Sequence, residues 1–186
     1  MNFGEEKNLN QQMEAHSGIY VKDKAWLAVY TRFQHEKKIH HTLVEKGIEA
    51  FLPLQRSIRV WSDRFVWTEV PLFSCYLFVK VKPKEHHTVL NTAGVVNFVK
   101  IGDKVAEIPE RQITAVKRFI NHPDIIQVTD EKLEQGDKVE IVRGPFMGII
   151  GELISFKGKK RVAIRLESLG KSLVIDISVA LLKKVD

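Results

Sequence analysis

The sequence contains a single cysteine, Cys75, and this scarcity excludes two kinds of structural support. One thiol cannot form an internal disulfide or build a cysteine-based zinc cluster. No run approaches the roughly 18 uncharged apolar residues that a membrane-spanning helix needs. The first 23 residues are polar and lack the apolar core of a signal peptide. We therefore expect a cytoplasmic protein that is neither membrane-spanning nor secreted.

The sequence also lacks the motifs that carry enzyme chemistry. It has no phosphate-binding glycine loop, no paired acids and no nucleophile elbow, and Cys75 has no motif-level His and Asn partner. Seven histidines include two adjacent pairs, His40 with His41 and His86 with His87. Adjacent residues on a helix point about 100° apart, so neither pair can chelate an ion from one face. We expect no catalytic residue, no cofactor and no metal.

What the sequence does contain is an uneven distribution of positive charge. The net charge is +6, with −2 in residues 1–23, +7 in residues 24–122 and +1 in residues 123–186. The +7 segment favours a polyanionic partner such as nucleic acid, because its field raises the local concentration of opposite charge. A Lys/Arg surface that serves solubility explains the same charge equally well.

Residues 24–122 interleave strand and helix patterns, which predicts an α+β domain: a mostly antiparallel sheet flanked by helices. Thr31 and Gln34 form a capping-box signal that predicts a helix ending near Gly47, with an apolar stripe of Phe33, Ile39, Leu43 and Val44. A short helical turn is expected after Pro83, and a longer helix from Pro109 to His122. Strands are expected over residues 26–30, 48–55, 57–61, 64–70, 76–81 and 95–99.

The two ends of the chain follow different patterns. Residues 1–23 show no apolar period and predict a flexible tail, and the charged residues 123–131 predict a linker. Residues 132–186 change to strand periodicity, with four strands expected over residues 137–142, 148–156, 160–167 and 172–178. Glycine turns between them predict a small β-barrel domain whose core is marginal.

Two stretches carry a resemblance to known proteins. GDKVEIVRGPFMGIIGEL (residues 136–153) resembles the KOW motif of SH3-like β-barrels. WLAV, PLFSCYLFV, GVVNFVKIGDKVAEIPERQI and that motif, in this order, resemble the NusG family of transcription elongation factors, with an N-terminal NGN domain. The segment AFLPLQRSIRVWSDRFVWTEVPLF is more similar to specialised paralogues such as RfaH and UpxY. The KOW positions are Gly136, Val139, Gly144, Phe146, Gly148 and Gly151.

The resemblance implies that the first domain binds the clamp helices of RNA polymerase through aromatic side chains. Phe73 is the expected main anchor with Tyr76, beside Trp26 and Tyr30, and Phe73→Ala should cost about 2 to 4 kcal/mol of affinity. The alternative is that all four rings are core residues. His87 and Thr88 fall near the His-Thr run that contacts the polymerase gate loop in such paralogues, and a helix-cap role is an equally good alternative.

The resemblance also implies contact with the exposed non-template DNA strand. The residues expected to make it are Arg32, Lys37, Lys38 and His41, although an exposed basic helix can be merely solvated. The sequence departs from the family at Ser74 and Cys75, where Pro and Gly are usual. It departs again at Ala93, where RfaH-like proteins often carry arginine.

The function implied is a non-enzymatic elongation or antitermination factor that suppresses pausing or termination, on specific long operons such as those for surface polysaccharides. One alternative is a general housekeeping factor, and another is an RNA- or ribosome-binding module led by the KOW barrel. The barrel is expected to recruit a ribosomal protein or a termination factor, and the protein to be a monomer. The β-branched strands predict that the barrel does not refold into helices.

Overall fold

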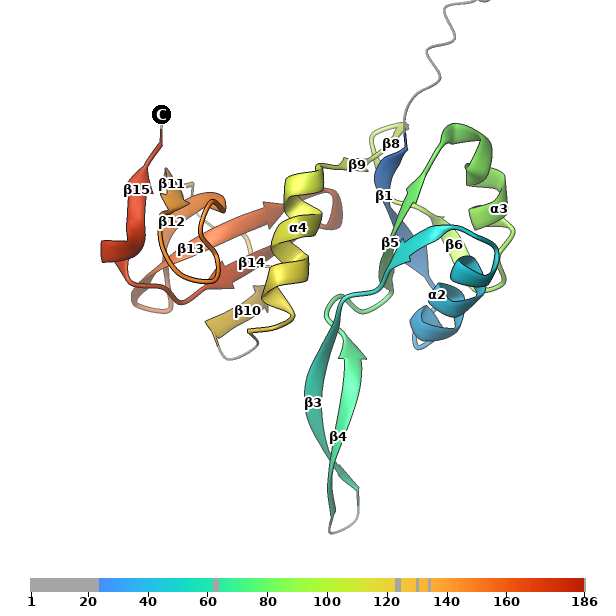
Figure 1. The fold of residues 1–186 in the computed structure, drawn as a ribbon, viewed down its shortest axis with the longest axis horizontal. Coiled ribbons are helices and arrows are strands. Elements are labelled where there is room, and N and C mark those ends of the chain that lie inside the picture. The colour runs from blue at the N-terminus through green and yellow to red at the C-terminus, as the bar shows by residue number, and fades with distance from the viewer. Residues whose placement is uncertain (1–23, 62–63, 123–124, 130, 134, 186) are drawn as a thin grey trace, which may run out of the picture.

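The computed structural model describes residues 24–61, 64–122, 125–129, 131–133 and 135–185. Two antiparallel sheets lie on opposite sides of helix α4 (Glu110–Phe119), and a long hairpin projects from the first sheet (Figure 1). The tail predicted for residues 1–23 lies outside the described residues.

The first sheet has the strand order β2-β5-β1-β6, with β9 also pairing with β1, and every pairing is antiparallel. The alternation of side chains along β1 divides the core in two. Leu27 and Val29 pack in the cluster that contains Ile39 of helix α2 (Glu36–Glu45), whereas Trp26 packs in the cluster that contains Val116 of α4. The predicted α+β sheet flanked by helices is therefore confirmed. Its strands are β1 (Ala25–Thr31), β2 (Glu49–Phe51), β5 (Tyr76–Val81), β6 (Val95–Phe98) and β9 (Glu107–Ile108).

The first helix begins later than the capping-box signal predicts. Helix α2 spans Glu36–Glu45, whereas Thr31 is the buried last residue of β1. Gln34 adopts a left-handed conformation, with φ of 61°, which is incompatible with a continuous helix through it. Phe33 and Val44 are exposed, so the predicted apolar stripe is wrong at these two positions.

The strands predicted on either side of Ser62 and Asp63 are confirmed as a hairpin. They are β3 (Leu54–Trp61) and β4 (Arg64–Pro71), which pair along their full length as a separate two-stranded sheet. The remaining elements of the first domain are short. They are η1 (Pro83–Glu85), α3 (His86–Leu90), β7 (Lys100–Ile101) and β8 (Lys104–Val105).

The C-terminal sheet has six strands rather than the four predicted from the sequence, in the order β10-β14-β13-β12-β11-β15. Residues 126–129 of the predicted linker form β10, because Ile126 and Val128 pack onto the core while β10 pairs with β14. The strand-rich barrel itself is confirmed. Its elements are β10 (Ile126–Thr129), β11 (Asp137–Ile141), β12 (Ile150–Phe156), β13 (Lys159–Leu166), η3 (Glu167–Leu169), β14 (Lys171–Ile175), η4 (Val179–Leu181) and β15 (Leu182–Lys184).

Helix α4 joins the two sheets into one hydrophobic core. A single cluster of buried residues runs from Trp26 through Val116 of α4 to Val139 of the barrel. Hydrogen bonds also cross from α4 to the barrel: Gln112 Nε2 donates to the Arg165 carbonyl at 2.9 Å, and Arg118 donates to the Met147 carbonyl at 2.8 Å. The two halves of the chain are therefore in direct contact.

Candidate functional site

The turn between β4 and β5 holds the main aromatic candidate, Phe73, inside the protein. Its side chain is 1% exposed and packs edge-on against Phe78, with ring centroids 6.0 Å apart. The expectation of a solvent-exposed anchor is wrong for this side chain, because it fills the core that the first sheet shares with α4 and the barrel. The alternative of a core residue is right for Phe73.

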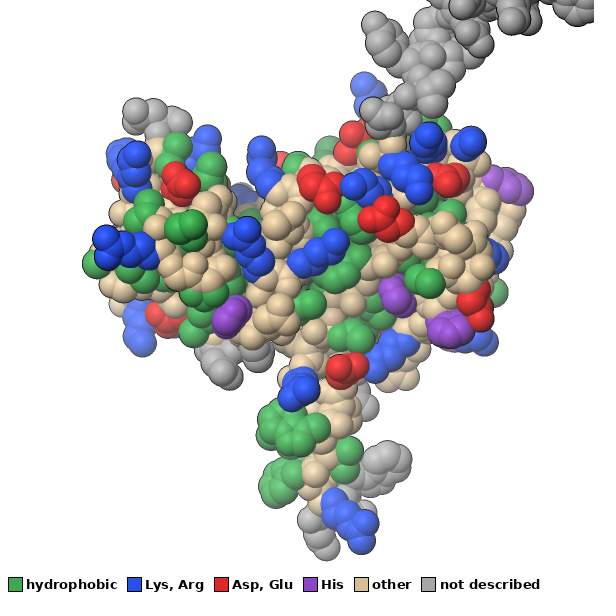
Figure 2. Space-filling model, in the orientation of Figure 1, with side chains coloured by type: hydrophobic (Ala, Val, Ile, Leu, Met, Phe, Trp, Pro, Cys, Tyr) green, Lys and Arg blue, Asp and Glu red, His purple; other side chains and the backbone are tan. Residues whose placement is uncertain are grey.

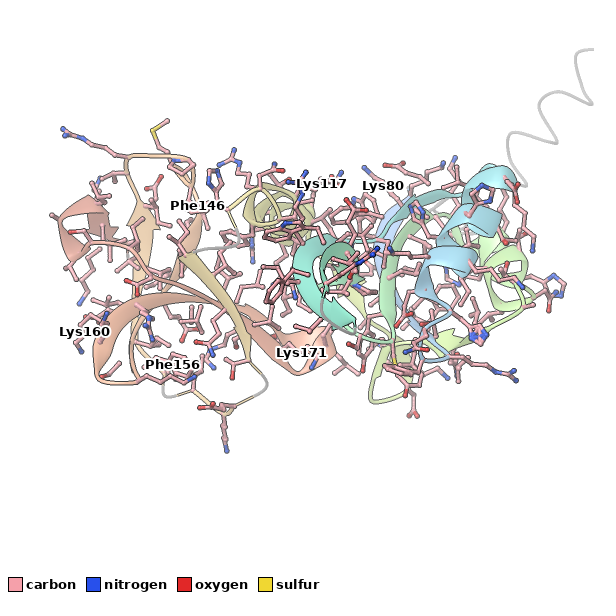
Figure 3. All side chains as sticks on the ribbon, turned by 90° about the horizontal axis from the view of Figure 1, so that it is seen from below. Lys80, Lys117, Phe146, Phe156, Lys160 and Lys171 are labelled. Atoms are coloured by element: carbon pink, nitrogen blue, oxygen red, sulfur yellow. The ribbon has the colours of Figure 1, made fainter. Side chains whose placement is uncertain are left out.

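Trp26 is also a core residue, and it fixes helix α4 to the sheet. Its Nε1–H donates to Glu110 Oε2 at 2.9 Å, and the ammonium groups of Lys80 and Lys117 lie 5.8 and 5.2 Å from its ring. Figure 3 labels these two lysines. Hydrogen bonding from Lys80, with that from Trp26, holds the pKa of the Glu110 carboxyl below its usual range. The Trp26 ring is only 3% exposed, so the structure favours the alternative that it is a core residue.

Tyr30 and Tyr76 are the members of the aromatic set that reach solvent. They lie opposite each other on β1 and β5, with ring centroids 5.4 Å apart, and Tyr30 is 42% exposed. Tyr76 is half-buried, and burial raises the pKa of its hydroxyl, followed by the neighbouring Tyr30 and Cys75. The pair forms a small aromatic surface that could accept an apolar partner, which we call the tyrosine pair.

Cys75 shapes the turn beside the tyrosine pair through its backbone. Its φ is 67°, its N–H donates to Glu36 Oε1 at 2.8 Å, and its carbonyl accepts from the Thr31 N–H at 2.9 Å. Burial, and then the Glu36 carboxylate, raises the pKa of the Cys75 thiol, which disfavours the nucleophilic thiolate. The thiol therefore fits a spectator role.

Glu36 is the residue at this site that sequence reasoning missed. Glu36 is the first residue of α2 and is buried, at 3% exposure. Its carboxylate accepts the Cys75 N–H and so ties the turn at Cys75 to the start of the helix. A glutamate three positions before the buried Ile39, on the inward face of the helix, was the available signal.

The expected nucleic-acid residues are exposed around the start of α2. Arg32 lies in the turn before the helix, where its N–H donates to the Gly94 carbonyl, and Lys37 and Lys38 lie in the first turn. His41 is one turn beyond Lys37, with Nδ1 3.3 Å from Glu45. Their part in DNA binding stays a prediction.

His87 and Thr88 lie inside α3, so neither is its N-cap residue, but the His87 carbonyl accepts from the N–H of the C-cap residue Asn91 at 3.0 Å. The residue at the N-cap position is Glu85. The His87 ring lies 2.9 Å from the Asn91 side-chain amide, and the Thr88 carbonyl accepts from Thr92 Oγ1 at 3.0 Å. His87 is exposed, and its contact with a gate loop stays a prediction.

The KOW-like stretch forms the corner of the barrel that faces α4. Gly136 and Gly151 lie against neighbouring strands, and a Cβ on Gly136 would overlap the Leu153 carbonyl. Phe146 is buried, and its ring centroid lies 5.0 Å from that of Phe119. The positions named for the motif are thus strand-packing or turn residues: Val139 is buried, and Gly144 and Gly148 have φ of 87° and 82°.

A family model described as "Transcription termination factor nusG" matches residues 24–117, just over half of the chain. The chain belongs to the NusG family. The first sheet with its helices is the NGN fold, and the C-terminal barrel is the KOW fold.

Relatives named "Transcription termination/antitermination protein NusG" match nearly the whole chain. One from Streptococcus pyogenes serotype M1 is 24% identical over 169 residues, covering 83% of this chain and 93% of its own. One from Staphylococcus aureus (strain N315) is 23% identical over 181 residues, covering 89% and 98%. A solved structure, "Domain interaction in Thermotoga maritima NusG", covers 88% of this chain and 98% of its own, at 19% identity and a TM-score of 0.49.

Neither a metal-binding cluster nor a membrane-spanning helix is found in the part of the chain that the structure describes. Within it, no three His, Cys, Asp or Glu side chains are grouped so that they could hold a metal ion. Its helices are all too short or too polar to cross a membrane.

Cys75 occupies a left-handed position where the family resemblance leads us to expect glycine. The effect of this difference on the free energy of unfolding can be measured. An L-residue pays about 1 to 2 kcal/mol in the left-handed region, and glycine avoids this cost but loses about 0.5 to 1 kcal/mol in backbone entropy. Cys75→Gly should therefore raise the free energy of unfolding by up to about 1 kcal/mol, measured by urea denaturation. Cys75→Ala is the control, because it removes the thiol and keeps the strain. Equal stability of the two variants would contradict the expectation.

Proposed function

We propose that this protein is a non-enzymatic transcription factor that binds RNA polymerase and suppresses pausing or termination. Membership of the NusG family is the observation that carries this proposal. The names of the curated relatives, which are transcription termination/antitermination proteins, support it. The most informative test is whether RNA polymerase co-purifies with the tagged full-length protein.

The tyrosine pair is the proposed contact with the polymerase clamp helices. Tyr30 and Tyr76 present two rings to solvent from neighbouring rigid strands, so they lose little side-chain entropy on docking. His87, exposed on α3, is the proposed contact with the gate loop across the cleft. A protein that contacts both sides of the cleft binds the closed polymerase more tightly than the open, paused polymerase. This difference in affinity shifts the population away from the paused state.

The double substitution Tyr30→Ala, Tyr76→Ala should weaken polymerase binding by about 2 kcal/mol or more, as expected for hot-spot aromatics. Fluorescence-detected titration of core polymerase with the labelled full-length protein measures this. Tyr76→Phe should bind nearly as the parent does, because it keeps the ring. Ile101→Ala is the matched control, because Ile101 is 61% exposed on a separate hairpin. Undiminished affinity in a folded double variant would remove the tyrosine pair from the interface.

The genes served are proposed to be a few long operons, such as those for surface polysaccharides. The similarity of residues 50–73 to specialised paralogues supports this, and a general factor acting on most genes is the alternative. Deleting the gene and sequencing total RNA separates them. Loss of distal transcripts confined to one or a few operons supports the specialist, and a genome-wide change supports the general factor.

The barrel is proposed to recruit a second partner, either a ribosomal protein or a termination factor. Because Phe146 and the Met147 carbonyl contact α4, the faces free for such a partner lie elsewhere, including the hairpin tip with exposed Lys157, Lys159 and Lys160. An RNA-led module is the rival function. Tight RNA binding through these lysines with a steep salt dependence, in a protein that ignores polymerase, would favour that rival.

A further inference from the structure

The hairpin of β3 and β4 carries an apolar face near its free end. Ile58 lies opposite Trp67 and Val60 opposite Phe65, and residues paired in this way point to the same side of a two-stranded sheet. The exposed fraction is 50% for Ile58, 67% for both Val60 and Trp67, and 76% for Phe65. We call these four residues the ribbon face; Figure 2 shows the apolar side chains gathered on the projecting hairpin.

The ribbon face is large for a surface that has no partner. The two aromatic side chains alone have about 150 to 250 Å² each to bury. With Ile58 and Val60, the exposed area reaches the roughly 300 to 600 Å² of the largest apolar patch on a typical monomer, which is often functional. The hairpin pairs with no other described strand. The core therefore gains nothing from these side chains, which points to a role in binding.

The spacing of the two rings suits flat aromatic ligands. Phe65 and Trp67 are two residues apart on β4, so their side chains leave the strand about 6.6 to 6.8 Å apart. Successive bases along a DNA strand rise by about 3.4 Å, so this separation is close to twice the stacking distance. Among the described rings, neither stacks on the other or on a third ring. Both therefore have faces free to stack on bases.

The charges around the ribbon face suit a polyanion. Arg56 is exposed on the same side of the ribbon as the four apolar residues, where it lies opposite Glu69. Arg64 is exposed at the tip and, as the neighbour of Phe65, points to the other side. The hairpin lies in the segment of residues 24–122, which has 16 Lys and Arg against 9 Asp and Glu. Exposed aromatic rings beside an arginine in a positively charged domain are a combination by which proteins bind single-stranded nucleic acid.

We propose that the ribbon face binds single-stranded nucleic acid by stacking Phe65 and Trp67 on unpaired bases. Arg56, on the same side of the ribbon, contacts a phosphate. This surface is separate from the basic residues at the start of α2, and it does not depend on polymerase binding. DNA and RNA share the bases and phosphates that this surface contacts, and the 2′-hydroxyl distinguishes them.

The test is fluorescence anisotropy of labelled 15-nucleotide oligo(dT) and oligo(U) titrated with the full chain. Trp67→Ala should weaken binding about tenfold, within the range of about 5- to 150-fold expected per stacked base. Trp67→Phe should retain most of the affinity because it keeps a ring, whereas Trp67→Leu should bind as weakly as Trp67→Ala. Ile101→Ala, which removes an exposed apolar side chain from another hairpin, should leave the affinity unchanged. The oligonucleotide bound more tightly identifies the natural strand.

A ring-independent result would overturn the proposal. Trp67→Ala binding as well as the parent, or Trp67→Leu restoring the affinity, would show that base stacking is not the mode of contact. Circular dichroism confirms that each variant is folded. A loss of polymerase affinity with unchanged oligonucleotide affinity would likewise overturn it and assign the face to a protein partner. The Tyr30→Ala, Tyr76→Ala variant should retain oligonucleotide binding, so the proposed function can fail independently.

Discussion

Replacing Phe73 by alanine is expected to destabilise the whole fold rather than weaken a single surface contact. The ring is 1% exposed and packs on Phe78 in the cluster shared by both sheets, so its removal leaves a cavity. Phe→Ala at such a site costs about 3 to 5 kcal/mol, against a total stability of about 5 to 15 kcal/mol for a small protein. Chemical denaturation followed by far-UV circular dichroism measures the change.

The matched control for Phe73 is Phe33→Ala, because Phe33 is 65% exposed and its truncation should shift stability by no more than about 0.5 kcal/mol. A Phe73→Ala variant with parental stability would show that the ring is not packed as described. This result also bears on polymerase binding: a loss of affinity in Phe73→Ala does not separate loss of fold from loss of contact, whereas Tyr76→Ala does.

Phe146→Ala is expected to uncouple the barrel from the rest of the chain. Its ring fills the junction between the sheets, with centroids 5.0 Å from Phe119 and 5.2 Å from His122. The substitution should lower the free energy of unfolding by about 3 to 5 kcal/mol. Since one hydrophobic cluster spans both sheets, the parent should unfold in one cooperative transition and the variant in two. Differential scanning calorimetry distinguishes the two patterns.

Met147→Ala is the control for the junction, because the Met147 side chain is exposed while its carbonyl accepts the bond from Arg118. It should keep the parental stability and the single transition. Separate transitions in the parent would mean that the shared cluster does not couple the two halves. A single transition in Phe146→Ala would place the coupling in the hydrogen bonds of Gln112 and Arg118 instead.

Local sequence signals predicted most of the elements correctly. The strand over residues 76–81 and the hairpin around residues 62–63 follow from β-branched and aromatic runs, and both occur as β5 and β3–β4. The signals failed where tertiary contacts outweighed them. Ile126–Thr129 was predicted as linker because the stretch around it is rich in charge, carries Pro123 and shows no clear period, yet it becomes β10 by pairing with β14.

The sequence predicted which aromatic residues belong to the candidate site, but not which of their side chains are exposed. The resemblance placed Phe73, Tyr76, Trp26 and Tyr30 in one aromatic set, and all four lie on or beside the same face of the first sheet. No pattern along the chain shows which of them α4 and the barrel cover. Glu36 was missed for a related reason, since its partner is a backbone N–H that is 39 residues away in sequence.

The sequence by itself determined the family, the two-part α+β and barrel architecture, and the positively charged first domain, because these depend on composition, periodicity and ordered motifs. The tertiary structure alone decided which aromatic side chains are accessible. Phe73 and Trp26 are buried in the core that the first sheet shares with α4 and the barrel, while the tyrosine pair and the ribbon face reach solvent. Burial depends on contacts between segments distant in sequence, which local patterns do not encode.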